Sequence, residues 1–138
     1  MPMEDIKRII VPVDNTEDSK KAVEKGAYLA KVLGVELKVI TVNDTHQFMS
    51  SVVLEDKLKK ESELFLDSFR KIAEKLGVEI DTQLISGKPA EEIIKFAKDG
   101  DLIIIAHHDR TKGFDKVIEK SVSKEVVQRA PCSVLVVK

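Results

Sequence analysis

Strand-like and helix-like segments alternate along the whole chain, and this alternation limits the folds that the sequence can adopt. Five short apolar runs rich in β-branched residues are predicted strands, at residues 6–13, 35–42, 78–85, 102–106 and 133–137. Between them, apolar residues recur at helical spacing, which predicts helices at residues 16–33, 52–76, 89–97 and 121–129. Strictly alternating strands and helices favour a mostly parallel sheet with right-handed crossovers and helices on both faces. The sequence therefore predicts an α/β fold.

Glycine, proline and hydroxyl residues mark the ends of the predicted helices. Gly34 and Gly77 each follow a leucine and precede Val-Glu, so we expect each helix to end in a left-handed residue and the chain to return at once into a strand. Thr16 and Asp18 are both candidates for the N-cap of the first helix. Pro89 suits the first turn of the third helix, because the N–H that proline lacks has no helical partner there.

Length and charge limit the classes of protein that fit this chain. Its 138 residues, 43% of them hydrophobic, can bury one core, which predicts a single domain over residues 1–138. The 23 basic and 24 acidic residues are spread along the whole length, so no charged block indicates nucleic acid or an anionic membrane. No apolar run approaches the roughly 20 residues that cross a bilayer, and the acidic start differs from a secretory signal. We therefore expect a cytoplasmic protein without nucleic-acid or membrane partners.

Two motifs, together with the order of elements, resemble the universal stress protein family. The first is Ile-Val-Pro-Val-Asp at residues 10–14, and the second is Val-Val-Gln-Arg-Ala-Pro-Cys-Ser-Val-Leu-Val-Val at residues 126–137. The resemblance covers essentially the whole chain. It implies a three-layer α/β domain of the adenine-nucleotide-hydrolase-like type, with a five-stranded parallel sheet in the order 3-2-1-4-5. It also implies a cytoplasmic setting and homodimers in which the last strands of two subunits pair.

The loop after the fourth predicted strand departs from the family's ATP-binding pattern. Members that bind ATP are similar in carrying Gly-x₂-Gly-x₉-Gly-Ser/Thr there. In this chain the three glycines align with His107, Arg110 and Lys120, and Ser121 is retained. Glycine allows a phosphate to approach backbone N–H groups closely, often with a positive φ, and a Cβ obstructs both. The resemblance thus implies where a nucleotide site lies, whereas the substitutions oppose ATP binding.

Three interpretations of this loop stay open. In the first, His107, Arg110 and Lys120 fill the phosphate volume, and the chain is a stress protein that binds ATP weakly or not at all. In the second, Arg110 and Lys120 hold phosphate by side-chain charge, aided by a helix that begins near Ser121, and the chain is a nucleotide-binding switch for ATP or AMP. In the third, residues 107–109 form a new site. A closed zinc site is not expected there, because successive residues leaving a strand point to opposite sides.

The resemblance assigns further positions to a nucleotide: Pro12, Val13 and Asp14 near the base and ribose, Val42 on the second strand, and Val122 beside Ser121 at the phosphate end. The ligand crevice of such sheets lies beyond the carboxyl ends of the strands, where the strand order reverses. The valines are equally well explained as core residues. Asp14 either accepts a hydrogen bond from a ribose hydroxyl or caps the turn that follows it.

No motif in the chain predicts catalysis. A phospho-acceptor site at Asp14 needs further acidic residues to hold magnesium, but Asn15 follows it and the third predicted strand ends in Ser-Gly. The phosphate-binding loop, the nucleophile elbow and the dinucleotide fingerprint are also absent from the sequence. An apolar final strand would leave an unpaired edge in a monomer. We therefore expect a non-catalytic homodimer that pairs through its C-terminal strand, has no metal site, carries no cofactor unless ATP binds, and associates with another protein.

Overall fold

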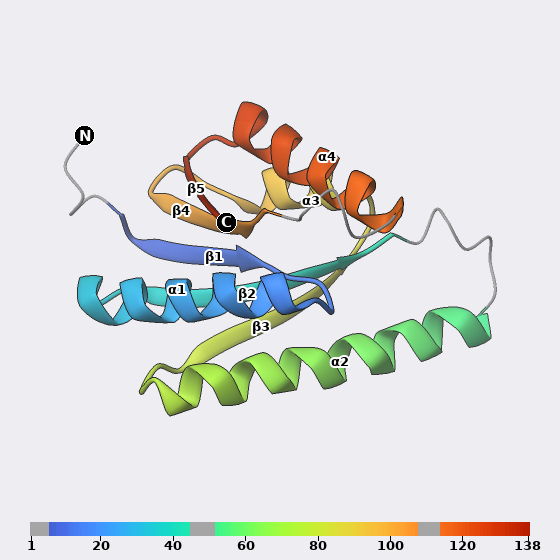
Figure 1. Ribbon diagram of the computed structural model, residues 1–138, viewed down its shortest axis with the longest axis horizontal. Coiled ribbons are helices and arrows are strands. Elements are labelled where there is room, and N and C mark those ends of the chain that lie inside the picture. Colours follow the sequence, from blue (N-terminus) through green and yellow to red (C-terminus); the bar gives the residue numbers. More distant parts are fainter. Residues whose placement is uncertain (1–5, 45–51, 108–113) are drawn as a thin grey trace.

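The computed structural model describes residues 6–44, 52–107 and 114–138, and the elements alternate as predicted (Figure 1). The strands are β1 (Arg8–Pro12), β2 (Glu36–Asn43), β3 (Ile80–Ser86), β4 (Asp101–Ala106) and β5 (Ser133–Val137). The helices are α1 (Glu17–Leu33), α2 (Val52–Lys75), α3 (Pro89–Phe96) and α4 (Phe114–Arg129). None of the described helices is long and apolar enough to cross a membrane.

All pairings within the sheet are parallel, and the strand order is β3-β2-β1-β4-β5, as expected from the resemblance. β1 lies between β2 and β4, with Ile9 opposite Leu37 on one side and Leu102 on the other. The chain therefore crosses from one half of the sheet to the other between β3 and β4, which makes the carboxyl ends of β1 and β4 the switch point of the topology.

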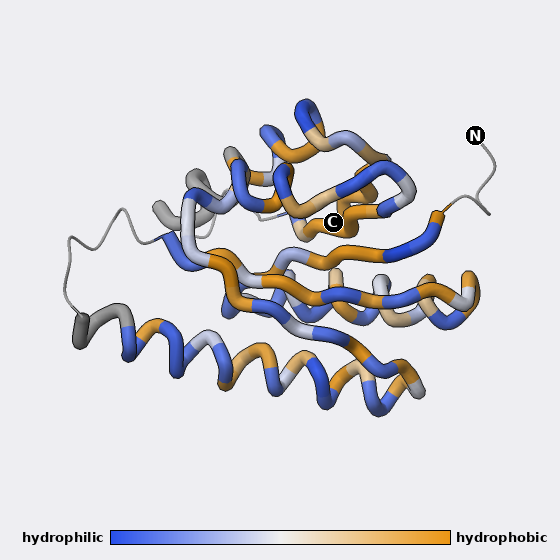
Figure 2. Tube along the Cα trace, turned by 180° about the vertical axis from the view of Figure 1, so that it is seen from behind, coloured by the Kyte–Doolittle hydropathy of each residue, from blue (hydrophilic) through white to orange (hydrophobic). Residues whose placement is uncertain are grey.

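Helices cover both faces of the sheet, α1 and α2 on one side and α3 and α4 on the other (Figure 1). Alternate residues of each strand point to opposite faces, so Ile9 and Val11 pack under α1 while Ile10 packs on the side of α3 and α4. Figure 2 shows hydrophobic stretches in the middle of the sheet and a mixture of hydrophilic and hydrophobic residues along the helices. β4 is buried along its whole length, as its apolar sequence predicted.

Local signals for α1 are confirmed at both of its ends. Thr16 is the N-cap, and its side chain accepts a hydrogen bond from the backbone N–H of Ser19. Gly34 follows the helix with a φ of 68°, and Gly77 follows α2 in the same left-handed region with a φ of 76°. In the middle of α1, Gly26 packs so closely on β1 that a Cβ there would lie 2.7 Å from Cγ2 of Val11.

The start of α4 differs from the prediction. The apolar spacing predicted a helix from Ser121, but the helix begins at Phe114. Residues 114–120 contain neither glycine nor proline and include two lysines and a glutamate, which are good helix formers, while the preceding Gly113 is a helix breaker. The apolar periodicity that guided the prediction is weak in this segment. Ser121 therefore lies in the interior of the helix.

Candidate functional site

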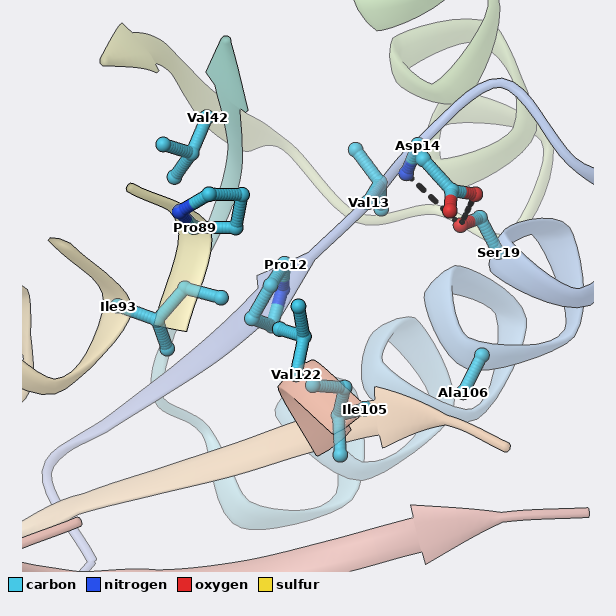
Figure 3. Close-up of a pocket in the computed structure, with 10 residues that line it drawn as sticks. All are labelled: Pro12, Val13, Asp14, Ser19, Val42, Pro89, Ile93, Ile105, Ala106 and Val122. Carbon is cyan, nitrogen blue, oxygen red and sulfur yellow. Dashed lines mark hydrogen bonds between the residues drawn. The ribbon is translucent and has the colours of Figure 1, made fainter. Parts of the chain in front are cut away.

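A pocket of about 210 Å³ opens at the carboxyl ends of β1 and β4, at the switch point of the sheet (Figure 3). Predicted site residues from three parts of the fold line it: Pro12, Val13, Asp14, Val42 and Val122. They come from β1 and the turn after it, from β2, and from α4. The structure thus brings together the positions that the resemblance assigned to a base and a ribose, with Val122 beside them.

Of the three positions that align with the family's glycines, the structure describes the surroundings of His107 alone. His107 follows β4, its backbone N–H donates to the Val137 carbonyl at 2.7 Å, and it is not among the described lining residues. Arg110, as well as His108 and Asp109 of the third interpretation, lies outside the described residues. Lys120 lies in α4, in a part of the helix whose side chains are not described.

Ser121 and Val122 are the seventh and eighth residues after Phe114, which opens α4. Only the first four N–H groups of an α-helix lack a partner within the helix. The backbone N–H groups of Ser121 and Val122 are therefore used inside α4. The expectation of a helix N-terminus at Ser121, on which the second interpretation of the loop relied, is wrong, because the helix extends further toward β4.

Ala106, the last residue of β4, also lines the pocket, as expected for a crevice beyond the carboxyl ends of the strands. Sequence reasoning missed the other residues that line it: Ser19, Pro89, Ile93 and Ile105. Three of them had usable signals. Ser19 stands three residues after the N-cap, at the position whose N–H the cap binds, and this places it next to the end of β1. Pro89 and Ile93 are four residues apart and share a face of α3, which brings that helix to the pocket wall.

The walls of the pocket are mainly apolar. Val13, Val42 and Val122 also pack in or against the two core clusters, so the core interpretation and the site interpretation of these valines hold together. Asp14 supplies a carboxylate and Ser19 a hydroxyl at one side (Figure 3). An apolar slot with polar groups at one edge is typical of sites for small molecules that have a flat apolar part and a polar part.

Hydrogen bonds hold Asp14 in the turn that leads into α1. Its carboxylate Oδ1 accepts from Thr16 Oγ1 at 2.5 Å and from Ser19 Oγ at 2.9 Å, while its backbone N–H donates to Ser19 Oγ at 2.9 Å. The Ser19 side chain is buried. Of the two roles considered for Asp14, capping of this turn is present in the structure, and the carboxylate still lines the pocket.

The strand ends around the pocket are held in register. The N–H of Val13 donates to the Ile40 carbonyl at 2.8 Å, and the buried Thr41 hydroxyl donates to the Val13 carbonyl at 2.9 Å. On the far side of β2, the Gly87 N–H donates to the Asn43 carbonyl at 3.0 Å. These bonds fix the ends of β1, β2 and β3 relative to one another. Among the described residues, no group of three or more histidine, cysteine, aspartate or glutamate side chains could hold a metal ion.

Comparisons with known proteins agree on one family. The model of the universal stress protein family (Usp) matches residues 5–138. A universal stress protein of Methanocaldococcus jannaschii is 34% identical over 140 residues, which cover 96% of this chain and 82% of that protein. A universal stress protein solved in complex with cAMP is 20% identical, with a TM-score of 0.75 over 96% of this chain and 97% of the other. The universal stress protein from Archaeoglobus fulgidus in complex with dAMP is 22% identical, with a TM-score of 0.72 over 96% and 98%.

Proposed function

Because the chain belongs to the universal stress protein family, we propose that it is a cytoplasmic, non-catalytic stress-response protein whose pocket takes up an adenine mononucleotide weakly. ATP binds no more tightly than AMP, because the triphosphate finds no cradle of backbone N–H groups. The protein acts by associating with another protein. The two relatives solved with cAMP and dAMP support adenine as the base.

The shape and lining of the pocket support a base and sugar as its contents. Its volume of about 210 Å³ is below the roughly 300–1,000 Å³ of pockets that enclose a drug-sized ligand, so it suits part of a nucleotide. Val42 and Ile93 provide apolar surface for the faces of a purine, and Asp14 provides an acceptor for a sugar hydroxyl.

The observation that carries the proposal is the position of Ser121 within α4. Phosphate binding at a helix N-terminus uses the unpaired N–H groups of the first turn. α4 begins at Phe114, and the helix itself uses the N–H groups of Ser121 and Val122. The glycine substitutions at His107, Arg110 and Lys120 add side chains where the family pattern has none. The alternative, a switch that holds phosphate through Arg110 and Lys120, loses the helix terminus that it invoked.

The proposal is tested by titrating the purified, nucleotide-free chain with AMP and with ATP plus magnesium, followed by NMR chemical shifts. We expect weak, saturable binding with similar affinity for both nucleotides. Binding of ATP tighter by about tenfold, or about 1.4 kcal/mol, would favour the switch, and Arg110→Ala and Lys120→Ala should then abolish that gain. Loss of saturable AMP binding altogether would refute the adenine pocket.

A pair of matched variants locates the binding. Val42→Glu places a charge on an apolar wall of the pocket and should abolish the shifts caused by AMP. Val32→Glu makes the same chemical change at a position on α1 that is 63% exposed, and it should leave binding unchanged. Thermal unfolding of both variants establishes that they are folded. Equal AMP affinity in the two variants would move the site elsewhere.

The supporting observation for self-association is the place of β5 in the sheet. β5 is an edge strand, and its apolar sequence leaves Leu135 38% exposed. An open apolar edge is a surface on which a further strand pairs. Two copies joined through β5 would pair this edge and extend the sheet across the dimer.

A further inference from the structure

A further hollow of the described surface lies between α1 and the end of β5. It has a volume of about 360 Å³, and we call it the α1–β5 groove. The residues that line it are Lys21, Glu24, Lys25, Tyr28, Val137 and Lys138. None of them lines the pocket at the switch point of the sheet, so the groove is a separate feature of the molecule.

The α1 side of the groove belongs to an outward stripe of the helix. Four residues at steps of four, three and four positions share one side of α1: Lys21, Lys25, Tyr28 and Val32. Tyr28 is 64% exposed, and Val32 is exposed to the same degree. Exposed apolar side chains that lie together inside a rim of charge are typical of sites at which proteins contact one another.

The charge of the groove is mainly positive, since three of its lining residues are lysines and one is a glutamate. Within the part of the chain that the structure describes, Lys21, Lys25 and Lys138 form no salt bridge, whereas the neighbouring Lys20 pairs with Glu17 at 3.0 Å. The whole chain has a net charge of −1, so the excess of positive charge is local. A ligand that carries carboxylates meets complementary charge here.

Apolar surface lies beside these cationic groups. Val137 packs against the core cluster under α1, and Tyr28 adds a ring and a hydroxyl that can donate to a carboxylate. Tyrosine is a frequent anchor at protein interfaces. A small anion such as phosphate would use the lysines and leave the apolar surface uncovered. A peptide with both acidic and apolar side chains uses the whole groove.

We propose that the α1–β5 groove binds an acidic segment of a partner protein. Glutamate or aspartate side chains of the segment meet Lys21 and Lys25, and one of its apolar side chains covers Tyr28. The inference rests on the part of the proposed function that concerns association with another protein, and it is independent of the nucleotide pocket. Strand pairing between two copies uses the backbone edge of β5, whereas the groove uses the Val137 side chain, so the two contacts involve different parts of β5.

The direct test titrates the full chain with a short peptide of repeating Glu-Glu-Leu, followed by NMR chemical shifts. We expect saturable shifts at Lys21, Lys25 and Tyr28 that weaken with added salt, because exposed charges are screened. A peptide of repeating Glu-Glu-Ser should bind about tenfold more weakly, since it lacks the apolar side chain. A peptide of repeating Lys-Lys-Leu should cause no shifts. Absence of saturable binding by the Glu-Glu-Leu peptide, or shifts confined to other parts of the chain, would overturn the inference and leave AMP binding untouched.

A pair of double variants tests the role of charge. Lys21→Gln with Lys25→Gln removes two lysines from the groove and should weaken binding of the Glu-Glu-Leu peptide by about fivefold or more. Lys71→Gln with Lys75→Gln on α2 is the matched control, because it removes two exposed lysines at the same spacing and changes the net charge equally. The control should leave the affinity unchanged. Equal weakening in both double variants would show that the peptide responds only to net charge, and this would overturn the inference.

A second pair of variants tests the apolar contact. Tyr28→Ala should weaken binding of the Glu-Glu-Leu peptide by about tenfold. Leu64→Ala removes a similarly exposed apolar side chain from α2 and should have no effect. Thermal unfolding establishes that both variants are folded. Equal affinity in the two variants would contradict the contact with Tyr28.

Two other occupants of the groove are separated by the same NMR signals. Shifts at Tyr28 that depend on the concentration of the chain alone, with no further change when the Glu-Glu-Leu peptide is added, would assign the groove to a second copy. Shifts caused by vesicles of anionic lipid but not by the peptide would assign it to a membrane surface. Either result would overturn the proposal of an acidic protein segment.

Discussion

Arg8 and Asp101 join the amino ends of β1 and β4 through two side-by-side hydrogen bonds. Nε donates to Oδ1 at 2.9 Å and Nη2 donates to Oδ2 at 2.7 Å. The Asp101 side chain is 5% exposed, and its Oδ2 also accepts from the Lys98 N–H at 2.7 Å. The guanidinium lies 4.9 Å from the ring centre of Phe96, at the end of α3. The pair thus ties β1, β4 and α3 together at the end of the sheet opposite the pocket.

Replacing Asp101 by alanine should lower the free energy of unfolding by about 3 kcal/mol, because it leaves the half-buried Arg8 and the Lys98 N–H without their acceptor. Asp81→Ala is the control. Asp81 pairs with Lys38 at 2.6 Å but is 58% exposed, and we expect a loss below about 1 kcal/mol. Urea unfolding monitored by circular dichroism measures both variants. Equal losses would show that burial of the Arg8 pair adds nothing.

Cys132 should react slowly with thiol reagents in the native protein. Burial raises the pKa of its thiol, and the negative charge of Asp101 acts in the same direction. Since the thiolate is the reactive form, the pH at which alkylation reaches half its maximal rate should be higher in the native chain than in urea. The raised pKa contributes stability that is complete below the unfolded pKa and is lost as the pH rises through the folded pKa. A lower native midpoint would contradict this.

Much of the fold could be predicted from local signals. The apolar runs and the glycines at positions 34 and 77 predicted the strands and two helix ends, because burial on both faces and positive φ leave direct marks on the sequence. The start of α4 could not be found in this way. Residues 114–120 favour a helix by propensity without a clear apolar stripe, and the prediction used the stripe.

The lining of the pocket could be predicted at the positions that match the family's motifs residue by residue. Pro12, Val13, Asp14, Val42 and Val122 line one pocket, and their binding of a nucleotide stays a prediction. Ile93 and Ile105 were missed because an apolar residue looks the same in a pocket wall as in a core. Ser19 was missed because its role depends on Asp14, and hydroxyls that act through another side chain leave no motif of their own.

Gly26 should not tolerate a methyl group. A Cβ at this position would lie 2.7 Å from Cγ2 of Val11, so Gly26→Ala must push α1 away from β1, and we expect a loss of about 1–3 kcal/mol in the free energy of unfolding.

The cause is tested by a double-mutant cycle. Val11→Ala removes the clashing methyl groups and creates a cavity by itself. The double variant with Gly26→Ala should therefore lose less free energy of unfolding than the sum of the two single losses. If urea unfolding shows that the two losses simply add, Gly26→Ala destabilises the protein by a cause other than contact with Val11.

Self-association through β5 predicts a mass of twice 15.4 kDa in sedimentation equilibrium at micromolar concentration. Leu135→Lys should shift this mass to that of a single chain, because a lysine on an edge strand opposes pairing with a second copy by charge and desolvation. Leu64→Lys makes the same change on α2, where Leu64 is 73% exposed and lies away from β5, so it should leave the dimer intact. A single-chain mass for the unmodified protein would refute the dimer, and a dimer that survives Leu135→Lys would move its interface away from β5.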